Sequence, residues 1–207
     1  MSPEASIPSH LGAAILGLLA RHERTGYDIA KAMEQPVGYF WTARHSQIYP
    51  ELARLEDADL VRHRVIDGAG PRPTKRYAVT ATGKRALRSW VVAELEPQPV
   101  RDLETLKLWS IWLVAPEAAK SLVRESLSAH QGRLAAYEQE LAEVNATDES
   151  RDPSQPLFAS RLTLEGGVRS RRAAVEWCEW MLDELDCASD HHRADEHHQG
   201  DGPRRRT

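Results

Sequence analysis

The chain has 207 residues, a mass of 23.3 kDa and a formal net charge of −4 at pH 7. Hydrophobic residues make up 41% and charged residues 28%, a composition that excludes a chain disordered over most of its length. The longest apolar run, residues 11–20, is about half as long as a bilayer-spanning helix. A secretory signal has basic residues before its apolar segment, and no Lys or Arg precedes this run. We therefore expect a cytoplasmic protein without a membrane partner.

Charge is distributed unevenly along the chain. Residues 1–95 carry 13 basic and 10 acidic side chains, whereas residues 96–207 carry 14 and 21. Within the first part, residues 44–88 hold 10 basic and 5 acidic side chains, so a polyanion is expected to dock there. The segment Glu96-Pro97-Gln98-Pro99 follows, and its prolines predict a linker because proline cannot continue a helix.

The linker predicts one domain over residues 1–95 and a second over residues 100–187. After Asp186 the sequence is rich in Asp, His, Arg and Gly and is almost free of apolar residues. Such a composition cannot bury a core, so residues 188–207 are expected to form a disordered tail.

Four helices are predicted in the first domain. Ser9 and Thr25 are suited to cap the first two, because their hydroxyl groups can accept hydrogen bonds from amides of the first turn. The third helix is predicted to start at Ser46, which places Pro50 at the edge of the first turn, where a missing N–H costs little. Thr80 is suited to cap the fourth helix in the same way as the first two.

A β-hairpin is predicted between the third and fourth helices. Residues 60–66 and 74–79 alternate in polarity, and a turn rich in Gly and Pro separates them. A lone hairpin is marginally stable in water, so its apolar side chains are expected to pack on the helices. These side chains are Val61, Val65, Tyr77 and Val79. Three helices followed by such a wing predict a winged helix-turn-helix.

The second domain is predicted to be helical throughout. An apolar segment over residues 103–115 precedes Pro116, which suits the first turn of a helix that continues to about Val144. A last helix is predicted over about residues 158–185. Its apolar residues recur every three or four positions, a pattern that calls for a partner helix. The expected fold is therefore mainly α, with an N-terminal winged helix-turn-helix, a two-stranded β-wing and a C-terminal α-helical dimerisation domain.

Residues 10–92 closely resemble the PadR family of transcriptional regulators. The matching segments are Leu16-Gly17-Leu18-Leu19, Thr25-Gly26-Tyr27-Asp28-Ile29, His45-Ser46-Gln47-Ile48-Tyr49-Pro50-Glu51-Leu52, Arg76-Tyr77 and Thr80-Ala81-Thr82-Gly83. The later segments Leu162-Thr163-Leu164 and Val175-Glu176-Trp177 are similar, more loosely, to the C-terminal domain that the family shares with AphA-like virulence activators. The wing departs from the family pattern because Gly70-Pro71-Arg72-Pro73 stiffens its tip.

The resemblance implies a homodimer that reads a pseudo-palindromic operator in double-stranded DNA. It further implies that the C-terminal helices of two subunits embrace, and that a small aromatic or hydrophobic effector relieves repression. A rival interpretation is a winged helix that serves only to bind another protein. A second rival is a ligand-binding or enzymatic helical domain joined to a vestigial winged helix.

The third helix and the residue before it hold candidates for base or phosphate contacts in the major groove. A helical period of 100° per residue places Ile48, Leu52 and Leu55 on the inner face and the candidates on the other sides. The candidates are Arg44, Ser46, Gln47, Tyr49 and Arg54. For Gln47 and Tyr49 the alternative is that they only border the core.

Further contacts with phosphates are expected from the wing and from the start of the second helix. The wing candidates are Arg62, Arg64, Arg72, Lys75 and Arg76, of which Arg72 is expected to probe the minor groove. The alternative is that these cations form an ordinary solvated face. Thr25, Gly26 and Tyr27 begin a helix whose amides and dipole favour an anion, although Tyr27 could equally pack in the core.

Four tryptophans form two i, i+3 pairs in the second domain, namely Trp109, Trp112, Trp177 and Trp180. Their flat faces suit an effector pocket, but a helical dimer interface would also bury several of them, and we favour the interface.

Neither a cofactor nor a metal ion is expected. The histidines of the tail, His191, His192, His197 and His198, have no ordered scaffold around them. Cys178 and Cys187 lack a CxxC spacing and are expected to be reduced thiols, one packed and one exposed. The sequence has no Gly-rich phosphate loop, nucleophile elbow or HExxH motif, so we expect no enzyme.

Overall fold

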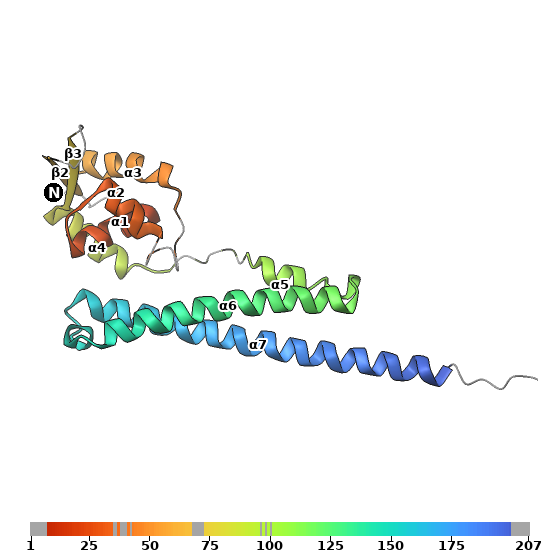
Figure 1. Cartoon of the computed structure of the whole chain (residues 1–207). Coiled ribbons are helices and arrows are strands. Elements are labelled where there is room, and N and C mark those ends of the chain that lie inside the picture. Colours follow the sequence, from red (N-terminus) through yellow and green to blue (C-terminus); the bar gives the residue numbers. More distant parts are fainter. Residues whose placement is uncertain are drawn as a thin grey trace, which may run out of the picture. The chain divides into compact units, whose positions relative to one another are not determined.

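The computed structural model describes residues 8–34, 37, 41, 43–67, 73–95, 97, 99 and 101–199, with side-chain burial through residue 187. The chain divides into two compact units, residues 1–98 and 99–207. The elements of the first unit, labelled in Figure 1, are α1 (His10–Arg21), β1 (Arg24–Thr25), α2 (Gly26–Glu34), α3 (His45–Asp57), β2 (Val61–Ile66), β3 (Thr74–Val79) and α4 (Ala81–Val91). This order confirms the predicted winged helix-turn-helix. No described helix is long and apolar enough to cross a membrane.

Helices α1, α2 and α3 pack around one apolar core. Ile15, Leu16, Ile29, Ile48 and Leu52 are each at most 1% exposed. Full burial of such a side chain contributes about 1.5–3 kcal/mol, so these side chains fix how the three helices are oriented around the core. The predicted inner face of the third helix, with Ile48, Leu52 and Leu55, is therefore confirmed.

The predicted start of the third helix is wrong by one residue. Helix α3 begins at His45, with Arg44 as its N-cap. The side-chain Oε1 of Gln47 accepts a hydrogen bond from the Arg44 backbone N–H at 2.9 Å. This bond stabilises a first turn that begins at His45, one residue before the predicted start. Pro50 is consequently the sixth helical residue. It is exposed, so water can reach the backbone carbonyl that lacks its N–H partner.

The sheet has three strands rather than the two predicted. Its order is β1-β3-β2, and both pairs are antiparallel. Strand β1 consists only of Arg24 and Thr25, opposite Tyr77 and Arg76. Two residues are too few for an alternating pattern, so sequence periodicity could not reveal this strand.

One of the four hairpin side chains expected on the helices lies elsewhere. Val61 and Tyr77 are buried and Val79 is partly buried, as predicted, but Val65 is 62% exposed. Val65 shares the face of Val61 but pairs with Lys75, close to the tip of the wing. The wing projects beyond the helices at this point, so the described residues leave most of Val65 exposed.

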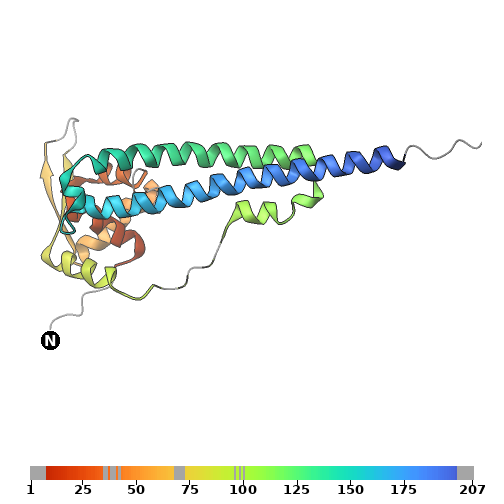
Figure 2. The ribbon, with the colours of Figure 1, turned by 90° about the horizontal axis from the view of Figure 1, so that it is seen from below.

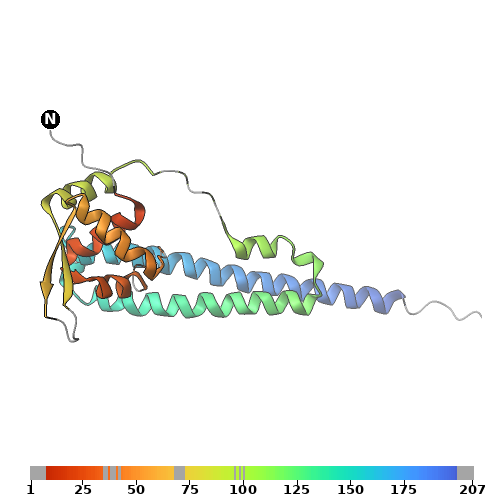
Figure 3. The same ribbon diagram turned by 90° about the horizontal axis from the view of Figure 1, so that it is seen from above.

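Three helices dominate the second unit. Its elements are α5 (Leu103–Leu108), η2 (Ile111–Leu113), α6 (Pro116–Asn145), η3 (Asp148–Arg151) and α7 (Pro156–Gln199). Figures 2 and 3 show α6 and α7 side by side and antiparallel. Near the start of α6, the Lys120 Nζ lies 2.6 Å from the Asp186 carboxylate, an ion pair that joins the two helices.

Helix α7 is longer than predicted at both ends. It begins at Pro156 and continues to Gln199, through most of the stretch assigned to a disordered tail from residue 188. Residues 188–199 contain no Gly or Pro, so no residue there interrupts the helical backbone. Residues 200–207 lie outside the described residues.

We predict that Ser9→Ala lowers the free energy of unfolding by about 1 kcal/mol. The Ser9 hydroxyl accepts from the Gly12 N–H at 2.9 Å and donates to the Glu51 carboxylate at 2.6 Å, so it both caps α1 and joins it to α3. Ser46→Ala is the matched control. Its hydroxyl caps no helix, and a change below about 0.5 kcal/mol is expected. Chemical denaturation of both variants measures the difference, and equal losses would contradict this role of Ser9.

Candidate nucleic-acid interface

Helix α3 turns one face to the core and the other to solvent. Ile48, Leu52 and Leu55 are buried, at most 3% exposed. All five candidate residues for the major groove are exposed, namely Arg44, Ser46, Gln47, Tyr49 and Arg54. They offer two guanidinium groups, two hydroxyls and an amide, which are groups that read base edges or bind phosphates. Gln47 and Tyr49, for which the alternative was a place at the border of the core, are both exposed, Tyr49 to 49%.

Two of these five side chains already hold intramolecular hydrogen bonds. The Gln47 Oε1 caps α3, so its amide NH₂ group is the part of the side chain that can donate to another molecule. The Arg54 Nη1 donates to the Glu51 carboxylate at 2.7 Å. Glu51 is 6% exposed and also accepts from Ser9, so the carboxylate holds Arg54 against its own helix. The Arg54 charge is therefore partly compensated in the free protein.

The ring of Tyr49 lies over the first residue of α2. A Cβ atom placed on Gly26 would come 2.6 Å from the Tyr49 ring. The Tyr49 ring also contacts the His45 ring at a centroid distance of 5.8 Å. This packing holds the Tyr49 hydroxyl beside the start of α2, where Tyr27 is 68% exposed. The structure thus places Tyr27 outside the core.

The N-terminus of α2 is closed by its own side chains. The Thr25 Oγ1 accepts from the Asp28 N–H at 3.1 Å, and the Asp28 carboxylate accepts from the Thr25 N–H and hydroxyl. These hydrogen bonds lower the pKa of Asp28, with a smaller contribution from the charges of Arg24 and Arg76. Thr25 is thus committed to the cap, which leaves Tyr27 as the exposed group at this helix start.

The predicted cations of the wing have different surroundings. Arg62 and Lys75 are exposed, whereas Arg64 Nη2 lies 2.7 Å from the Glu23 carboxylate. Arg76 is only partly exposed, and its Nε is buried without a hydrogen-bond partner among the described residues. Arg72 lies outside the described residues. The described wing therefore offers Arg62 and Lys75 as its most accessible charges.

Sequence reasoning missed the contribution of Arg24. This residue belongs to β1, opposite Tyr77, and its Nε is buried without a hydrogen-bond partner among the described residues. Burial, and then the Arg24 charge, lowers the pKa of Arg21. Arg24 therefore adds positive charge close to the start of α2. In the sequence, the only indication of this positive charge is that Arg21 and Arg24 both precede the Thr25 cap.

Gly26→Ala is expected to destabilise the first unit by about 1–3 kcal/mol, because the new methyl group must displace the Tyr49 ring. The control is Gly17→Ala in α1, where nothing lies within 4 Å of the added atom. That change should stabilise the helix by up to about 1 kcal/mol. Thermal unfolding gives both values, and a stabilised Gly26→Ala protein would contradict the packing of Tyr49.

The four paired tryptophans of the second unit lie largely at its surface. Trp109 and Trp112 are 82% and 78% exposed, and Trp180 is 57% exposed, while Trp177 is 37% exposed. The two most exposed tryptophans have apolar neighbours that are also exposed. We call the following set the α5 patch: Leu103, Leu106, Trp109, Trp112 and Leu113. Five large, exposed apolar side chains within residues 103–113 are more than scattered surface residues, and such groups mark interaction surfaces.

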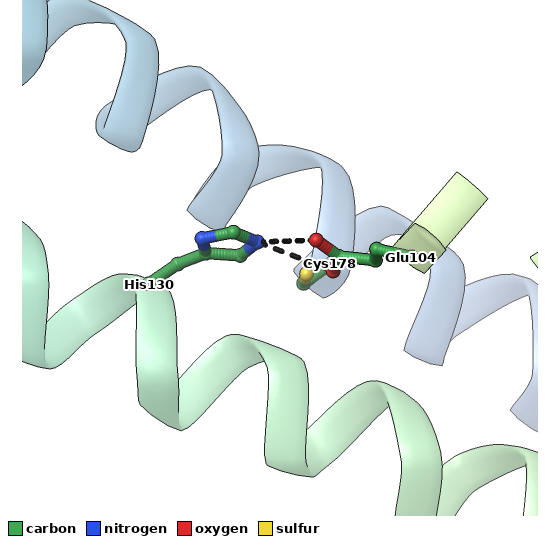
Figure 4. A group of neighbouring side chains, drawn as sticks. All are labelled: Glu104, His130 and Cys178. Atoms are coloured by element: carbon green, nitrogen blue, oxygen red, sulfur yellow. Dashed lines mark hydrogen bonds and ion pairs between the residues drawn. The ribbon is translucent and has the colours of Figure 1, made fainter. Parts of the chain in front are cut away.

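A buried polar cluster lies between α5, α6 and α7 (Figure 4). The Nε2 of His130 lies 3.1 Å from the Glu104 carboxylate, and its Nδ1 lies 3.1 Å from Nη1 of Arg171. Since arginine can only donate, Nδ1 accepts and Nε2 carries the proton of a neutral imidazole. Cys178 is buried beside them, and this burial, followed by the Glu104 and Glu179 charges, raises the pKa of its thiol.

Sequence reasoning missed this cluster as well. Its members come from three helices. The hydrogen-bonded pairs are 26 and 41 positions apart in sequence, so no short spacing motif predicts the cluster. The expectation of one packed and one exposed cysteine is confirmed, with Cys178 buried and Cys187 exposed.

Comparisons with known proteins agree on both units. Residues 15–89 match the "Transcriptional regulator PadR-like family", and residues 100–186 match "Virulence activator alpha C-term". The negative transcriptional regulator PadR of Bacillus subtilis is 32% identical over 174 residues, which cover 84% of this chain and 96% of that protein.

Two solved structures of B. subtilis PadR are similar over most of both chains. The complex with operator DNA has a TM-score of 0.75 at 30% identity and covers 86% of this chain and 99% of that one. The complex with p-coumaric acid has a TM-score of 0.70 at 32% identity and covers 85% and 95%.

Proposed function

The chain belongs to the PadR-like family of transcriptional regulators, and from this we propose that it is a homodimeric repressor that binds a pseudo-palindromic operator. The observation that carries the proposal is the exposed face of α3, which presents Arg44, Ser46, Gln47 and Tyr49 together. The relative from B. subtilis, solved with operator DNA, supports it because the two chains share their fold nearly end to end. The proposal assigns the chain no catalytic activity.

In this proposal the first turns of α3 enter the major groove. The Gln47 amide and the Ser46 hydroxyl contact base edges, while Arg62 and Lys75 of the wing bind phosphates. The net charge of −4 does not oppose this, because binding releases counterions only from the phosphates that are neutralised locally. Affinity should therefore fall steeply as salt concentration rises.

The α5 patch supports a dimer. Tryptophans that are about four-fifths exposed gain hydrophobic free energy when a second subunit covers them. A two-fold axis would place two α3 helices about 34 Å apart, one turn of B-DNA, to match the two halves of an operator.

We further propose that a small aromatic or hydrophobic effector releases the operator. The support is the solved complex of the B. subtilis relative with p-coumaric acid. Such an effector acts by favouring a dimer geometry in which the α3 spacing no longer fits DNA. The coupling in such systems is typically about 1–3 kcal/mol and reciprocal, so operator DNA weakens effector binding by the same factor.

The role of the α5 patch predicts the behaviour of Trp109→Ser. Loss of a central aromatic contact should weaken the dimer at least about tenfold, while the free subunit keeps its stability because the side chain is exposed. Leu95→Ser is the control, since Leu95 is 93% exposed and lies outside the patch. Sedimentation equilibrium measures both dissociation constants. A Trp109→Ser dimer as tight as the wild type would remove the patch from the interface.

The role of Gln47 is tested by Gln47→Glu, which keeps an oxygen acceptor for the Arg44 N–H but removes the amide donors. We expect the variant to stay folded and to lose much of its preference for operator over random DNA. Lys75→Ala is the control, because loss of a phosphate contact should weaken binding to both DNAs alike and reduce the salt dependence.

Gel shifts at several salt concentrations, with DNA from upstream of the gene and with random DNA, measure these effects. Undiminished discrimination by the Gln47→Glu protein would contradict the placement of α3 in the groove. Absence of any DNA preference in the wild type would favour a winged helix that only binds protein.

A further inference from the structure

We propose that Glu104, His130 and Cys178 form a binding site for a divalent transition metal ion of the zinc type. Each residue offers one ligand atom, and the three ligand atoms lie within 4.8 Å of one another. Cys178 and His130 are buried, and Glu104 is partly buried. The site goes beyond DNA binding and does not depend on it.

The donor set selects the class of metal. Zinc binds thiolate sulfur at about 2.3 Å and imidazole nitrogen or carboxylate oxygen at about 2.0–2.2 Å. Ligand atoms around a tetrahedral ion are therefore about 3.3–3.7 Å apart, so the ligand atoms need to approach one another by at most about 1.5 Å. Magnesium and calcium prefer all-oxygen sites and would not take the Cys178 sulfur.

Three protein ligands leave one position of a tetrahedral ion for water or a small molecule. A pocket of about 370 Å³ adjoins the cluster, and Glu104 and His130 are among its lining residues. Apolar side chains, including Leu103 and Leu108, line the same pocket. The fourth position can therefore open into a space large enough for more than water.

Arg171 sets the main cost of metal binding. An ion at Nε2 of His130 replaces the proton there, and Nδ1 must then carry it. A protonated Nδ1 cannot accept from the guanidinium that now donates to it at 3.1 Å. Arg171 lines the pocket and is partly exposed, so it has room to withdraw. The Cys178 thiol releases its proton to solvent as the sulfur binds.

The ion would join three helices. Glu104 belongs to α5, His130 to α6 and Cys178 to α7, as Figure 4 shows. Helix α5 also carries Leu103 and Leu106 of the α5 patch. Metal binding would thus hold α5 against the α6–α7 pair and fix how those side chains are presented.

Cobalt titration of the full chain under reducing conditions tests the site. A thiolate ligand produces a sulfur-to-cobalt charge-transfer band in the near ultraviolet, which the histidines of the tail cannot produce. We expect the band in the wild type and in Cys187→Ser, which removes the exposed cysteine, and its loss in Cys178→Ser. Added zinc should abolish the band in the wild type. A wild type without the band, or a band lost only in Cys187→Ser, would overturn the proposal.

Two more variants test the other ligands. His130→Gln should lower cobalt affinity at least about tenfold, the lower bound for losing even a supporting partner of a metal ligand. Arg171→Gln should raise the affinity, because the glutamine oxygen can accept from a protonated Nδ1. Circular dichroism checks that both proteins are folded. If folded His130→Gln binds as tightly as the wild type, or Arg171→Gln binds more weakly, His130 is not a ligand through Nε2.

Discussion

The burial of one face of α3 is the constraint on which the proposed interface depends. Ile48, Leu52 and Leu55 contribute several kcal/mol through their removal from water, and this fixes the rotation of the helix about its axis. Once that rotation is set, Ser46 and Gln47 must face solvent. The burial of the apolar residues of α3 therefore decides which of its side chains remain accessible to DNA.

Hydrogen bonds that stabilise the fold also limit what the interface can offer. Gln47 caps α3, Thr25 is held in the cap of α2, and Arg54 is bound by the buried carboxylate of Glu51. In the proposed interface, each bond would hold its side chain in place before DNA binds, which would lower the entropy lost on binding. The same bonds reduce the number of free polar groups, so the proposed interface has fewer side chains for DNA contacts than the sequence alone suggests.

The second unit combines an exposed apolar surface with a buried polar cluster. Trp109 and Trp112 gain free energy only when covered, whereas the hydrogen bonds of His130 to Glu104 and Arg171 offset the cost of burying its ring. Both features meet at α5, a helix of six residues with no buried side chain. So short a helix has little stability of its own, so its position depends on the groups that it contacts.

Local chemistry made much of this protein readable from its sequence. Hydroxyl residues at Ser9, Thr25 and Thr80 cap helices as predicted, and apolar spacing identified the inner face of α3. Tertiary contacts decided the rest. The pairing of β1 with β3 brings together segments that are remote in sequence. The same holds for the cluster of Glu104, His130 and Cys178. The exposure of Val65 depends on where the wing lies relative to the helices. Hydrophobic periodicity depends only on residues that are a few positions apart, so it does not predict contacts between distant segments.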